Sequence, residues 1–482
     1  MRPLILAAVA ASLAGCAVGP DYVRPTAPAG TDQPAFKEIG MWKPAAPAAA
    51  ASDAAWWKAY GDTQLDALVD QANHANQTIQ QAEAQYREAQ ALVQGARAGY
   101  FPTVGISGSV QRARTLNQGV ETLGDTHSWS LQASWEPDLW GGVRRRNEAA
   151  GASAEASAAD LAAARLTVQA AVVNDYIQLR LQDQQKDLFT RTIAGYEKSL
   201  ALTEAQYRAG IVTRSDVALA RNTLASARAQ AVDVDLTRRQ VEHALAVLVG
   251  QSPAAFSVEP APLAFVLPQT PVGLPSELLE RRPDVAGAER RVAAANANIG
   301  VAIAAWYPNL TLGAAGGFQG VGFGPWFASP GRVWALGASL AETLFDGGAR
   351  SAQVSQARAA LDVAAASYRQ TVLGGFQEVE DNLAALGDLE QEGLQQEEAA
   401  RAAHDSEQVL LAQYRAGTAV YTSVITAQAA ALTADRAVLQ VQGRRYAASV
   451  ALVKALGGGW TAARLSSPDA AATASNSPNS HE

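Results

Sequence analysis

Four stretches of the chain alternate between apolar residues and small or polar ones with a period of two. In 127–138 large apolar residues alternate with hydroxyl and amide residues: Trp129, Leu131, Ala133 and Trp135 against Ser128, Ser130, Gln132 and Ser134. The same alternation runs through 103–114, 308–318 and 332–343. Because successive side chains of a strand point to opposite faces, the pattern predicts four β-strands, each with one apolar face.

Helical spacing fills most of the remaining chain. Residues 143–208 contain no Pro and only two Gly, and one apolar seam starts at Leu161 and another at Leu166. These positions lie roughly 140° apart around a helix, so the helix should pack against two neighbours, as in the wall of a cylinder. A second long helix is predicted at 349–415, and shorter ones at 65–98, 214–250, 284–304 and 421–456.

The two halves of the sequence follow one plan. Both long helices end in Ala-Gln-Tyr-Arg-Ala-Gly, at 205–210 and 412–417. A period of about two hundred residues is that of a duplicated domain, because solenoid repeats have periods of up to roughly 50 residues. We therefore expect a first repeat at 61–260 and a second repeat at 284–460. A Pro-rich equatorial collar at 261–283 lies between them, and a disordered tail follows at 461–482.

The predicted strands fit either a soluble sandwich or a membrane. Each has about ten residues, long enough to cross a bilayer at a tilt. Aromatic residues near the strand ends favour a transmembrane barrel with interfacial girdles: Tyr100, Phe101, Trp140, Trp306, Tyr307 and Phe345. Four strands cannot close a barrel, which needs about eight, so the sequence predicts an oligomer. Two chains would give eight strands and three would give twelve, and the small polar faces favour the wider, water-filled barrel.

The N-terminus has the features of a secretory signal. An apolar run from Leu4 to Leu13 precedes Ala-Gly-Cys16, and it is too short to span a membrane as a helix. Residues 13–16 resemble a bacterial lipobox, so we expect 1–15 to be removed and Cys16 to be acylated. Ala17 stands where an Asp would resemble the signal for retention at the inner membrane, which favours the outer membrane. Residues 16–60, rich in Pro and Ala, are then a lipidated, extended strap.

Composition excludes several classes of function. The net charge is −8, and Lys and Arg are scattered among acids, so no basic face is available for nucleic acid. The five His are also scattered, and Cys16 is the only Cys, which excludes an intrachain disulfide. Without a catalytic or metal-binding motif, we predict no enzyme activity, no metal site and no cofactor beyond the lipid on Cys16.

Two other patterns have simple interpretations. The Gly-rich segment 319–324 lacks the Lys-Ser/Thr pair and helix start of a phosphate loop, so we predict an exposed hairpin loop there, as at 115–126. The acids Glu378, Glu380 and Asp381 lie within a long helix. We predict a solvated or lumen-lining face for them, and not a general acid–base pair.

Three signatures point to one family. They are Gly-Pro-Asp-Tyr at 19–22, Arg-Arg-Pro-Asp at 281–284, and the paired Tyr-Arg-Ala-Gly turns. Together they resemble the outer-membrane factors of the TolC superfamily, specifically the OprM/NodT-like efflux lipoproteins. The similarity runs from Cys16 to about Trp460.

The resemblance implies a mainly α fold with a transmembrane β part. In such a homotrimer, four strands per chain contribute to a shared twelve-stranded β-barrel, continuous with a periplasmic α-helical barrel. The resemblance also implies a protein that is lipid-anchored in the outer membrane and extends into the periplasm. Its implied partners are a periplasmic adaptor (membrane fusion) protein and an inner-membrane, proton-driven pump of the RND type.

The resemblance assigns a docking role to the hairpin tips. Gly210 and Gly417 lie where the family contacts its adaptor, and a Gly there also lets a helix reverse sharply. The neighbouring Arg208 and Arg415 either complement their helix C-termini or pair with the adaptor. For the Arg-Arg-Pro-Asp box we expect only an ion-pair network at a helix start.

A periplasmic gate is implied near the same tips. Asp216 and Tyr414 lie where the family links neighbouring helices, and we predict a hydrogen bond between them that holds the aperture closed. At positions where the best-known member has a gate Arg and aspartates, this chain has Ala419, Ser423 and Thr426. Its gate chemistry and ion preference therefore depart from that member.

Three functions remain open at this point. They are a passive duct for drugs and other small toxic compounds, an exit duct for a secreted peptide or protein, and a structural lipoprotein of the envelope. Lipidation and the OprM-like signatures favour the efflux duct. In such a duct the pump, and not the wide lumen, selects the substrate.

Overall fold

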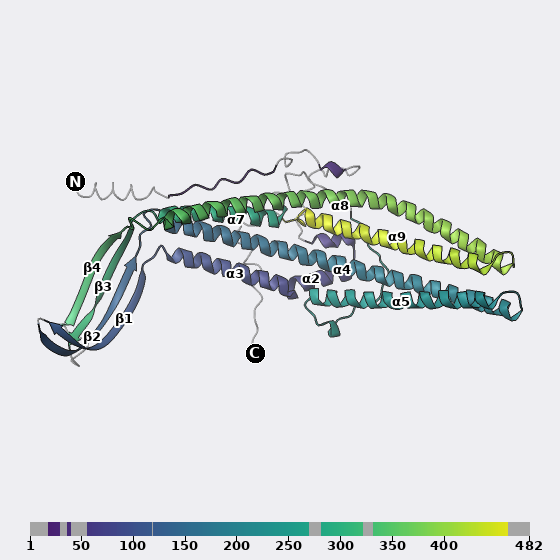
Figure 1. Cartoon of the computed structure of the whole chain (residues 1–482), viewed down its shortest axis with the longest axis horizontal. Helices are drawn as coiled ribbons and strands as arrows, with labels where there is room; N and C mark the ends of the chain where they lie inside the picture. Colours follow the sequence, from purple (N-terminus) through teal and green to yellow (C-terminus); the bar gives the residue numbers. More distant parts are fainter. Residues whose placement is uncertain are drawn as a thin grey trace. The chain divides into compact units, whose positions relative to one another are not determined.

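The computed structural model describes residues 18–28, 36–39, 55–117, 119–268, 281–321 and 331–460 of the 482-residue chain. The chain divides into two compact units, whose elements are labelled in Figure 1. The first comprises the described residues among 1–26, 85–158 and 287–368, and it holds the sheet. The second comprises those among 27–84, 159–286 and 369–482, and it is helical.

The first unit contains one antiparallel sheet. Its strands follow each other in chain order: β1 (Thr103–Asn117), β2 (Val120–Trp135), β3 (Asn309–Val321) and β4 (Arg332–Ala341). The register places apolar residues opposite each other, with Ile106 facing Leu131, and Trp129 facing Phe318. This register confirms the four predicted strands and joins their apolar faces into one side of the sheet.

The hairpin between β1 and β2 differs from the prediction. Residues 115–126 are predicted to be a loop, but the strands continue into this segment, and Thr115 pairs with Thr122. Gly119 has a φ of +82°, which lets the chain reverse in a short turn. The segment contains three Thr and one Val, residue types that favour strands, and the ladder extends almost to the turn.

The other strand limits shift by a few residues. β2 ends at Trp135 and β4 at Ala341, each earlier than predicted. Residues 319–321 of the predicted Gly-rich loop belong to β3, where they pair with 126–128. Residues 322–324 of that loop lie outside the described residues.

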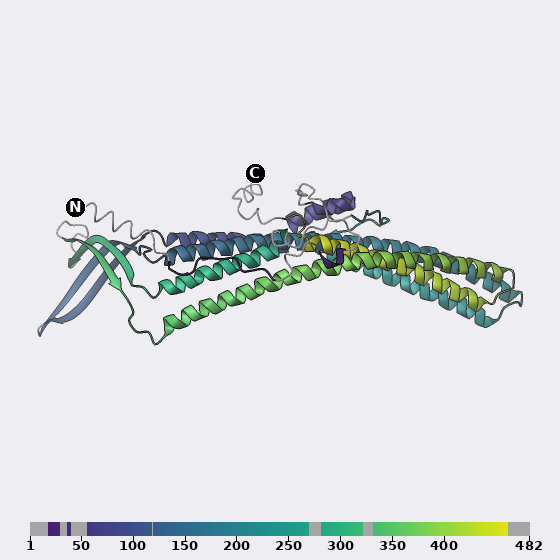
Figure 2. The same ribbon diagram turned by 90° about the horizontal axis from the view of Figure 1, so that it is seen from above.

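The long helices have the same length in both halves. α4 (Gly142–Arg208) and α8 (Ala349–Arg415) each have 67 residues, and α5 (Arg214–Leu248) and α9 (Tyr421–Ala455) each have 35. Figures 1 and 2 show α4 beside α5 and α8 beside α9, each pair joined as a hairpin. With α7 (Pro283–Ala304), these helices match the predicted limits to within two residues.

An aspartate starts each long helix. Asp138 accepts hydrogen bonds from the backbone N–H groups of Val143 and Arg144 at 2.8 and 2.9 Å. Asp346 accepts equivalent bonds from Gly348 and Arg350 at 3.0 and 3.1 Å. These bonds satisfy N–H groups of the first turn that have no partner within the helix. The Arg350 side chain and these N–H groups hold the pKa of Asp346 at about 2.

The predicted helix 65–98 is two helices. α2 (Thr63–Ala75) and α3 (Gln77–Ala98) meet at Asn76, whose backbone is extended. The Asn76 side chain accepts hydrogen bonds from the N–H groups of Thr78 and Ile79 and donates one to the Leu248 carbonyl at 2.8 Å. It therefore ends α2, caps α3 and ties both to α5. An Asn between two helical patterns is a weak sequence signal, which explains why the break was not predicted.

Aromatic and aliphatic residues form the core of the second unit. Tyr60, Leu65, Tyr176 and Leu245 are fully buried in it. Tyr60 belongs to a short 3₁₀ helix, Trp56–Tyr60, so this end of the predicted strap is folded and not extended. A second cluster packs the strap residue Phe36 against α8 and α9. Segment 36–39 thus joins the core as well.

The described start of the predicted collar is fixed to the helices. Phe265 packs in the core, and its carbonyl accepts a hydrogen bond from the Tyr446 hydroxyl at 2.9 Å. Just before the collar, Arg238 donates to the Val258 carbonyl at 2.6 Å, and Arg180 to the Glu259 carbonyl at 2.7 Å. Residues 269–280 of the collar lie outside the described residues.

Candidate functional site

The sheet presents two chemically different faces. Its apolar face is open in this chain, with exposed fractions of 74%, 75% and 74% for Ile106, Trp334 and Leu336. On the opposite face, Ser107 pairs with Ser130 at 3.1 Å, and Ser109 with Ser128 at 2.9 Å. In the described part of the chain this is the only sheet, and β1 and β4 each have one neighbour. Among the described residues no second sheet covers the apolar face, so the chain does not form the two-sheet sandwich that was the alternative within this part of the structure.

The six predicted interface aromatics lie where strands join helices. Phe101 and Phe345 are 68% and 87% exposed, and Tyr100, Trp306 and Tyr307 are partly exposed. Trp140 differs, because it stacks on Tyr307 at 4.8 Å and donates to the Pro308 carbonyl at 2.7 Å. It therefore also links the two repeats within the first unit. Their location at the membrane interface stays a prediction.

The N-terminal strap is anchored in the first unit by the Gly-Pro-Asp-Tyr signature. The Val18 N–H donates to the Trp140 carbonyl at 3.1 Å, and buried Arg145 binds Asp21 at 2.8 Å. The Tyr22 hydroxyl donates to Glu289 of α7, and burial, followed by that bond, raises the pKa of Tyr22. Cys16 itself lies outside the described residues, two positions before Val18.

Both hairpin tips have the same backbone geometry. Gly210 and Gly417 have φ of +77° and +75°, and each donates its N–H to the carbonyl of the Tyr three residues earlier. Such a left-handed Gly ends a helix and starts the reversal of the chain. Arg208 is exposed and donates to the Glu204 carbonyl at 3.3 Å, so it complements its own helix C-terminus. Arg415 is exposed at the second tip.

The chain was also compared with known proteins. The model of a family described as outer membrane efflux protein matches residues 68–251 and again residues 274–458. The first match lies within the first predicted repeat, and the second covers the second repeat up to residue 458 together with the last ten residues of the predicted collar. The chain belongs to the outer membrane efflux protein family. This confirms the resemblance read from the three sequence signatures.

Two curated relatives and two solved structures agree with this membership. The chain is 32% identical over 431 residues to the pyoverdine export outer membrane protein OpmQ of Pseudomonas aeruginosa, covering 86% of this chain and 90% of OpmQ. It is 30% identical to the toluene efflux pump outer membrane protein TtgC of Pseudomonas putida, covering 95% of each. The outer-membrane channel OprN is 30% identical, with a TM-score of 0.84 over 92% of this chain and all of OprN. VceC of Vibrio cholerae is 28% identical, with a TM-score of 0.79 over 84% of this chain and 99% of VceC.

The predicted gate bond is not formed within the protomer. The Tyr414 hydroxyl, which is buried, shares a hydrogen bond of 3.1 Å with Thr203, and the ring lies 5.2 Å from that of Tyr421. Asp216 instead accepts bonds from the N–H and hydroxyl of Thr213 at 2.8 and 2.7 Å, in a capping box that starts α5. Burial raises the pKa of Tyr414, and the charge of nearby Asp216 adds to the rise. Sequence reasoning missed Thr203 because nothing in the sequence pairs it with a Tyr 211 positions later.

The Arg-Arg-Pro-Asp box forms the predicted ion-pair network. Arg282 is 7% exposed and contacts Asp284 at 2.7 Å and Glu378 at 2.8 Å. It also donates to the Ala455 carbonyl at 3.0 Å, so it joins the start of α7 to the end of α9 and the middle of α8. The box is therefore a structural junction.

Of the three predicted acids of α8, Glu378 and Asp381 are exposed and Glu380 is half-buried. Glu378 pairs with Arg282, and Glu380 accepts the backbone N–H groups of Lys37 and Glu38 at 2.7 and 2.8 Å. The exposure of Glu378 and Asp381 agrees with the predicted solvated face, and the carboxylates of Glu378 and Glu380 also bind donors from other segments. That this face lines a lumen stays a prediction. Asp381 accepts a bond from Gln377, one turn earlier on the same helix, at 3.3 Å.

Proposed function

We propose that the chain forms the passive outer-membrane duct of a tripartite efflux system, as a homotrimer. The observation that carries the proposal is a four-stranded sheet with one exposed apolar face, one polar face and an open edge on either side. Lipid cannot satisfy the hydrogen-bonding groups of an open edge, so β1 of one copy has to pair with β4 of the next. Three copies give twelve strands, with the serine-rich face towards a wet lumen.

The hairpin tips are the proposed docking site for a periplasmic adaptor, which links the duct to an inner-membrane RND-type pump. Gly210 and Gly417 place two similar turns at the ends of the α4–α5 and α8–α9 hairpins. Exposed Arg208 and Arg415 lie beside them. Similar turns in both halves would give the adaptor six related contacts around a trimer.

The lipid anchor and the aromatics are proposed to fix the depth of the duct in the membrane. Val18 is held at the junction of sheet and helices, and Cys16 precedes it by two residues, at most ~7 Å of chain. Acyl chains on Cys16 would therefore enter the bilayer beside Trp140 and the exposed aromatics at the strand ends. Replacing Cys16 by Ser should abolish incorporation of a labelled fatty acid without unfolding the chain.

The substrates proposed are drugs and other small toxic organic compounds. Two of the relatives are named for pyoverdine export and toluene efflux. These differ widely in size and polarity, which fits a duct that leaves selection to its pump. A secreted peptide is the competing cargo.

Two measurements test the proposal. Purified full-length protein in a planar bilayer should give stable conductance steps, which a structural lipoprotein would not give. Deletion of the gene should sensitise cells to dyes, detergents and antibiotics if the duct serves efflux. Unchanged susceptibility together with loss of a secreted peptide would instead support the exit-duct alternative.

A further inference from the structure

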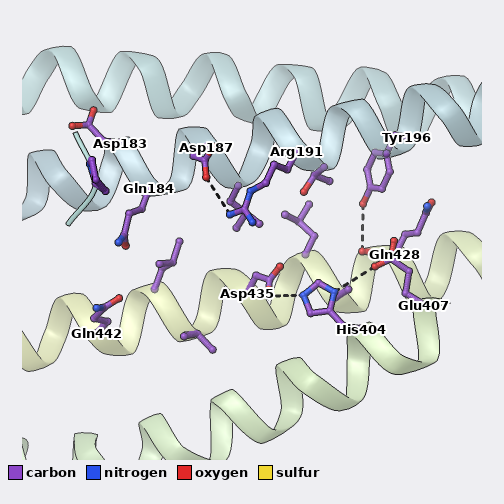
Figure 3. Close-up of a pocket in the computed structure, with 18 of the residues that line it drawn as sticks. Asp183, Gln184, Asp187, Arg191, Tyr196, His404, Glu407, Gln428, Asp435 and Gln442 are labelled. Carbon is purple, nitrogen blue, oxygen red and sulfur yellow. Dashed lines mark hydrogen bonds and ion pairs between the residues drawn. The ribbon is translucent and has the colours of Figure 1, made fainter. Parts of the chain in front are cut away.

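A groove in the second unit has no role in the proposed duct or docking tips. It has a volume of about 810 Å³ and lies between α4 on one side and α8 and α9 on the other (Figure 3). Pro260 and the first two residues of the collar, 261 and 262, border it. Its apolar wall is formed by side chains from α4 and α9: Leu188, Tyr196, Leu432, Val438 and Leu439. Pockets of this size hold drug-sized molecules in other proteins.

Acidic groups outnumber basic ones around the groove. α4 contributes Asp183, Asp187 and Arg191, α8 contributes His404 and Glu407, and α9 contributes Asp435. Asp183 is neutralised by Arg180 and Arg238, at 3.0 and 2.6 Å. Asp187 pairs with Arg191 at 3.2 Å.

Two carboxylates therefore share a single imidazole. His404 lies 2.9 Å from Asp435 and 3.6 Å from Glu407, and Figure 3 shows it between them. When the imidazole is neutral, the groove keeps an excess of negative charge. That excess favours a cation, and it opposes the binding of an anion.

Two carbonyl oxygens on facing helices lack a donor. Gln428 of α9 is 3% exposed and lines the groove, and its Nε2 donates to Ser199 at 3.1 Å. Its Oε1 is buried and accepts no hydrogen bond from any described residue, and the same holds for Oε1 of Gln184 on α4. A buried acceptor without a donor costs free energy. A ligand whose N–H group donates a hydrogen bond to that acceptor therefore gains binding free energy.

We propose that this groove binds an organic cation that carries amine N–H groups on an apolar body. The positive charge lies against Glu407 and Asp435, and the N–H groups donate to Oε1 of Gln428 and of Gln184. The apolar body packs against Leu188, Leu432 and Leu439. Such a ligand bridges α4 of the first repeat and α8 and α9 of the second. The site does not depend on whether the chain conducts.

The site should weaken in acid. Burial raises the pKa of Glu407, an effect that His404 and Gln428 partly offset. As pH falls, Glu407 therefore takes up a proton above the ordinary pH range of a glutamate. Protonation of Glu407 removes one of the two negative charges that hold the ligand.

Ethidium is a suitable probe, because it is a permanent cation with two aromatic amines. We expect saturable binding to the purified full-length protein by fluorescence at pH 8, and an affinity that falls by at least ~10-fold at pH 5. Glu407→Gln and Asp435→Asn, which keep shape and remove charge, should each raise the dissociation constant about 10-fold at pH 8. Gln428→Leu should raise it about 5-fold, the usual effect of one lost hydrogen bond.

Asp405→Asn provides the matched control. Asp405 follows His404 directly, but it is exposed and does not line the groove, so this variant should bind ethidium like the wild type. The apolar anion 8-anilinonaphthalene-1-sulfonate should not compete with ethidium. Thermal unfolding of every variant distinguishes a lost site from a lost fold. The proposal is overturned if binding is absent, if the anion competes equally, or if Asp405→Asn weakens binding as much as Asp435→Asn does.

Discussion

Gly19 lies where the N-terminal strap crosses α7 within the first unit. Its φ is +99°, and a Cβ at this position would lie 2.5 Å from the Gly300 Cα and 3.1 Å from its nitrogen. Gly300 is equally constrained, since its own Cβ would meet the Arg145 side chain at 2.6 Å. The Gly-Pro-Asp-Tyr signature therefore starts with a Gly because two backbones touch, and Arg145 then fixes Asp21 beside this contact at 2.8 Å.

Gly19→Ala should release the strap from α7. Gly61→Ala is the matched control, because Gly61 also has a positive φ, +75°, but a Cβ there meets nothing within 4 Å. The control should lower the free energy of unfolding by about 1 kcal/mol, the usual cost of a left-handed Ala. Gly19→Ala adds a backbone clash, so thermal unfolding should show a larger loss, with faster proteolysis of the strap. Equal losses in the two variants would contradict the close contact.

At the scale of elements, Asn76 gives a sharp test of the junction between α2 and α3. Asn76→Ala removes the cap of α3 and the bond to the Leu248 carbonyl. We expect the free energy of unfolding to fall by about 1–2 kcal/mol, measured by denaturant titration. Gln77→Ala is the control, because the exposed Gln77 side chain donates one hydrogen bond, to the Ala75 carbonyl. This variant should lower the free energy of unfolding much less. A continuous α2–α3 helix would instead gain stability from an Ala at position 76.

Variants at the start of α5 can distinguish two roles of Asp216, capping of the helix and closure of the gate. Asp216→Ala removes the capping box and should fray the first turn of α5, at a cost of about 1 kcal/mol. We expect a higher single-channel conductance and uptake of large hydrophilic antibiotics. Thr213→Ala removes the reciprocal bond and should reproduce both effects. The predicted hydrogen bond between Asp216 and Tyr414 is not formed within one protomer. If only Asp216→Ala changes conductance, and Tyr414→Phe matches it, then Asp216 acts through Tyr414 of another protomer.

Periodicity accounts for which elements are predictable. Strands with alternating faces, such as 127–135, and helices free of Pro, such as 143–208, follow from local side-chain preferences. Contacts between distant segments do not, so the Thr203 partner of Tyr414 and the strap partner of Glu380 were missed. The duplicated Tyr-Arg-Ala-Gly turns were predictable because both halves need the same left-handed Gly.

At the scale of the whole molecule, the open edges of the sheet decide how many copies assemble. The mature chain has no Cys beyond position 16, so engineered thiols can report on contacts between copies. The polar-face residues of the edges are suitable sites: Ser107 and Ser109 on β1, and Ala335, Gly337 and Ser339 on β4. Chains with one Cys on each edge, in the correct register, should form disulfides from copy to copy around the barrel.

If three copies form the barrel, these disulfides should give monomer, dimer and trimer bands on a denaturing, non-reducing gel, with no band above the trimer. Chains with a Cys on β1 alone or on β4 alone should stay monomeric, because the polar faces of two identical edges do not meet when β1 pairs with β4. The twelve-stranded barrel leaves room for water beside the serine ladder, whereas an eight-stranded barrel would be filled by its own side chains. A largest cross-linked band of two chains would therefore contradict both the trimer and the water-filled lumen, and with them the proposed duct.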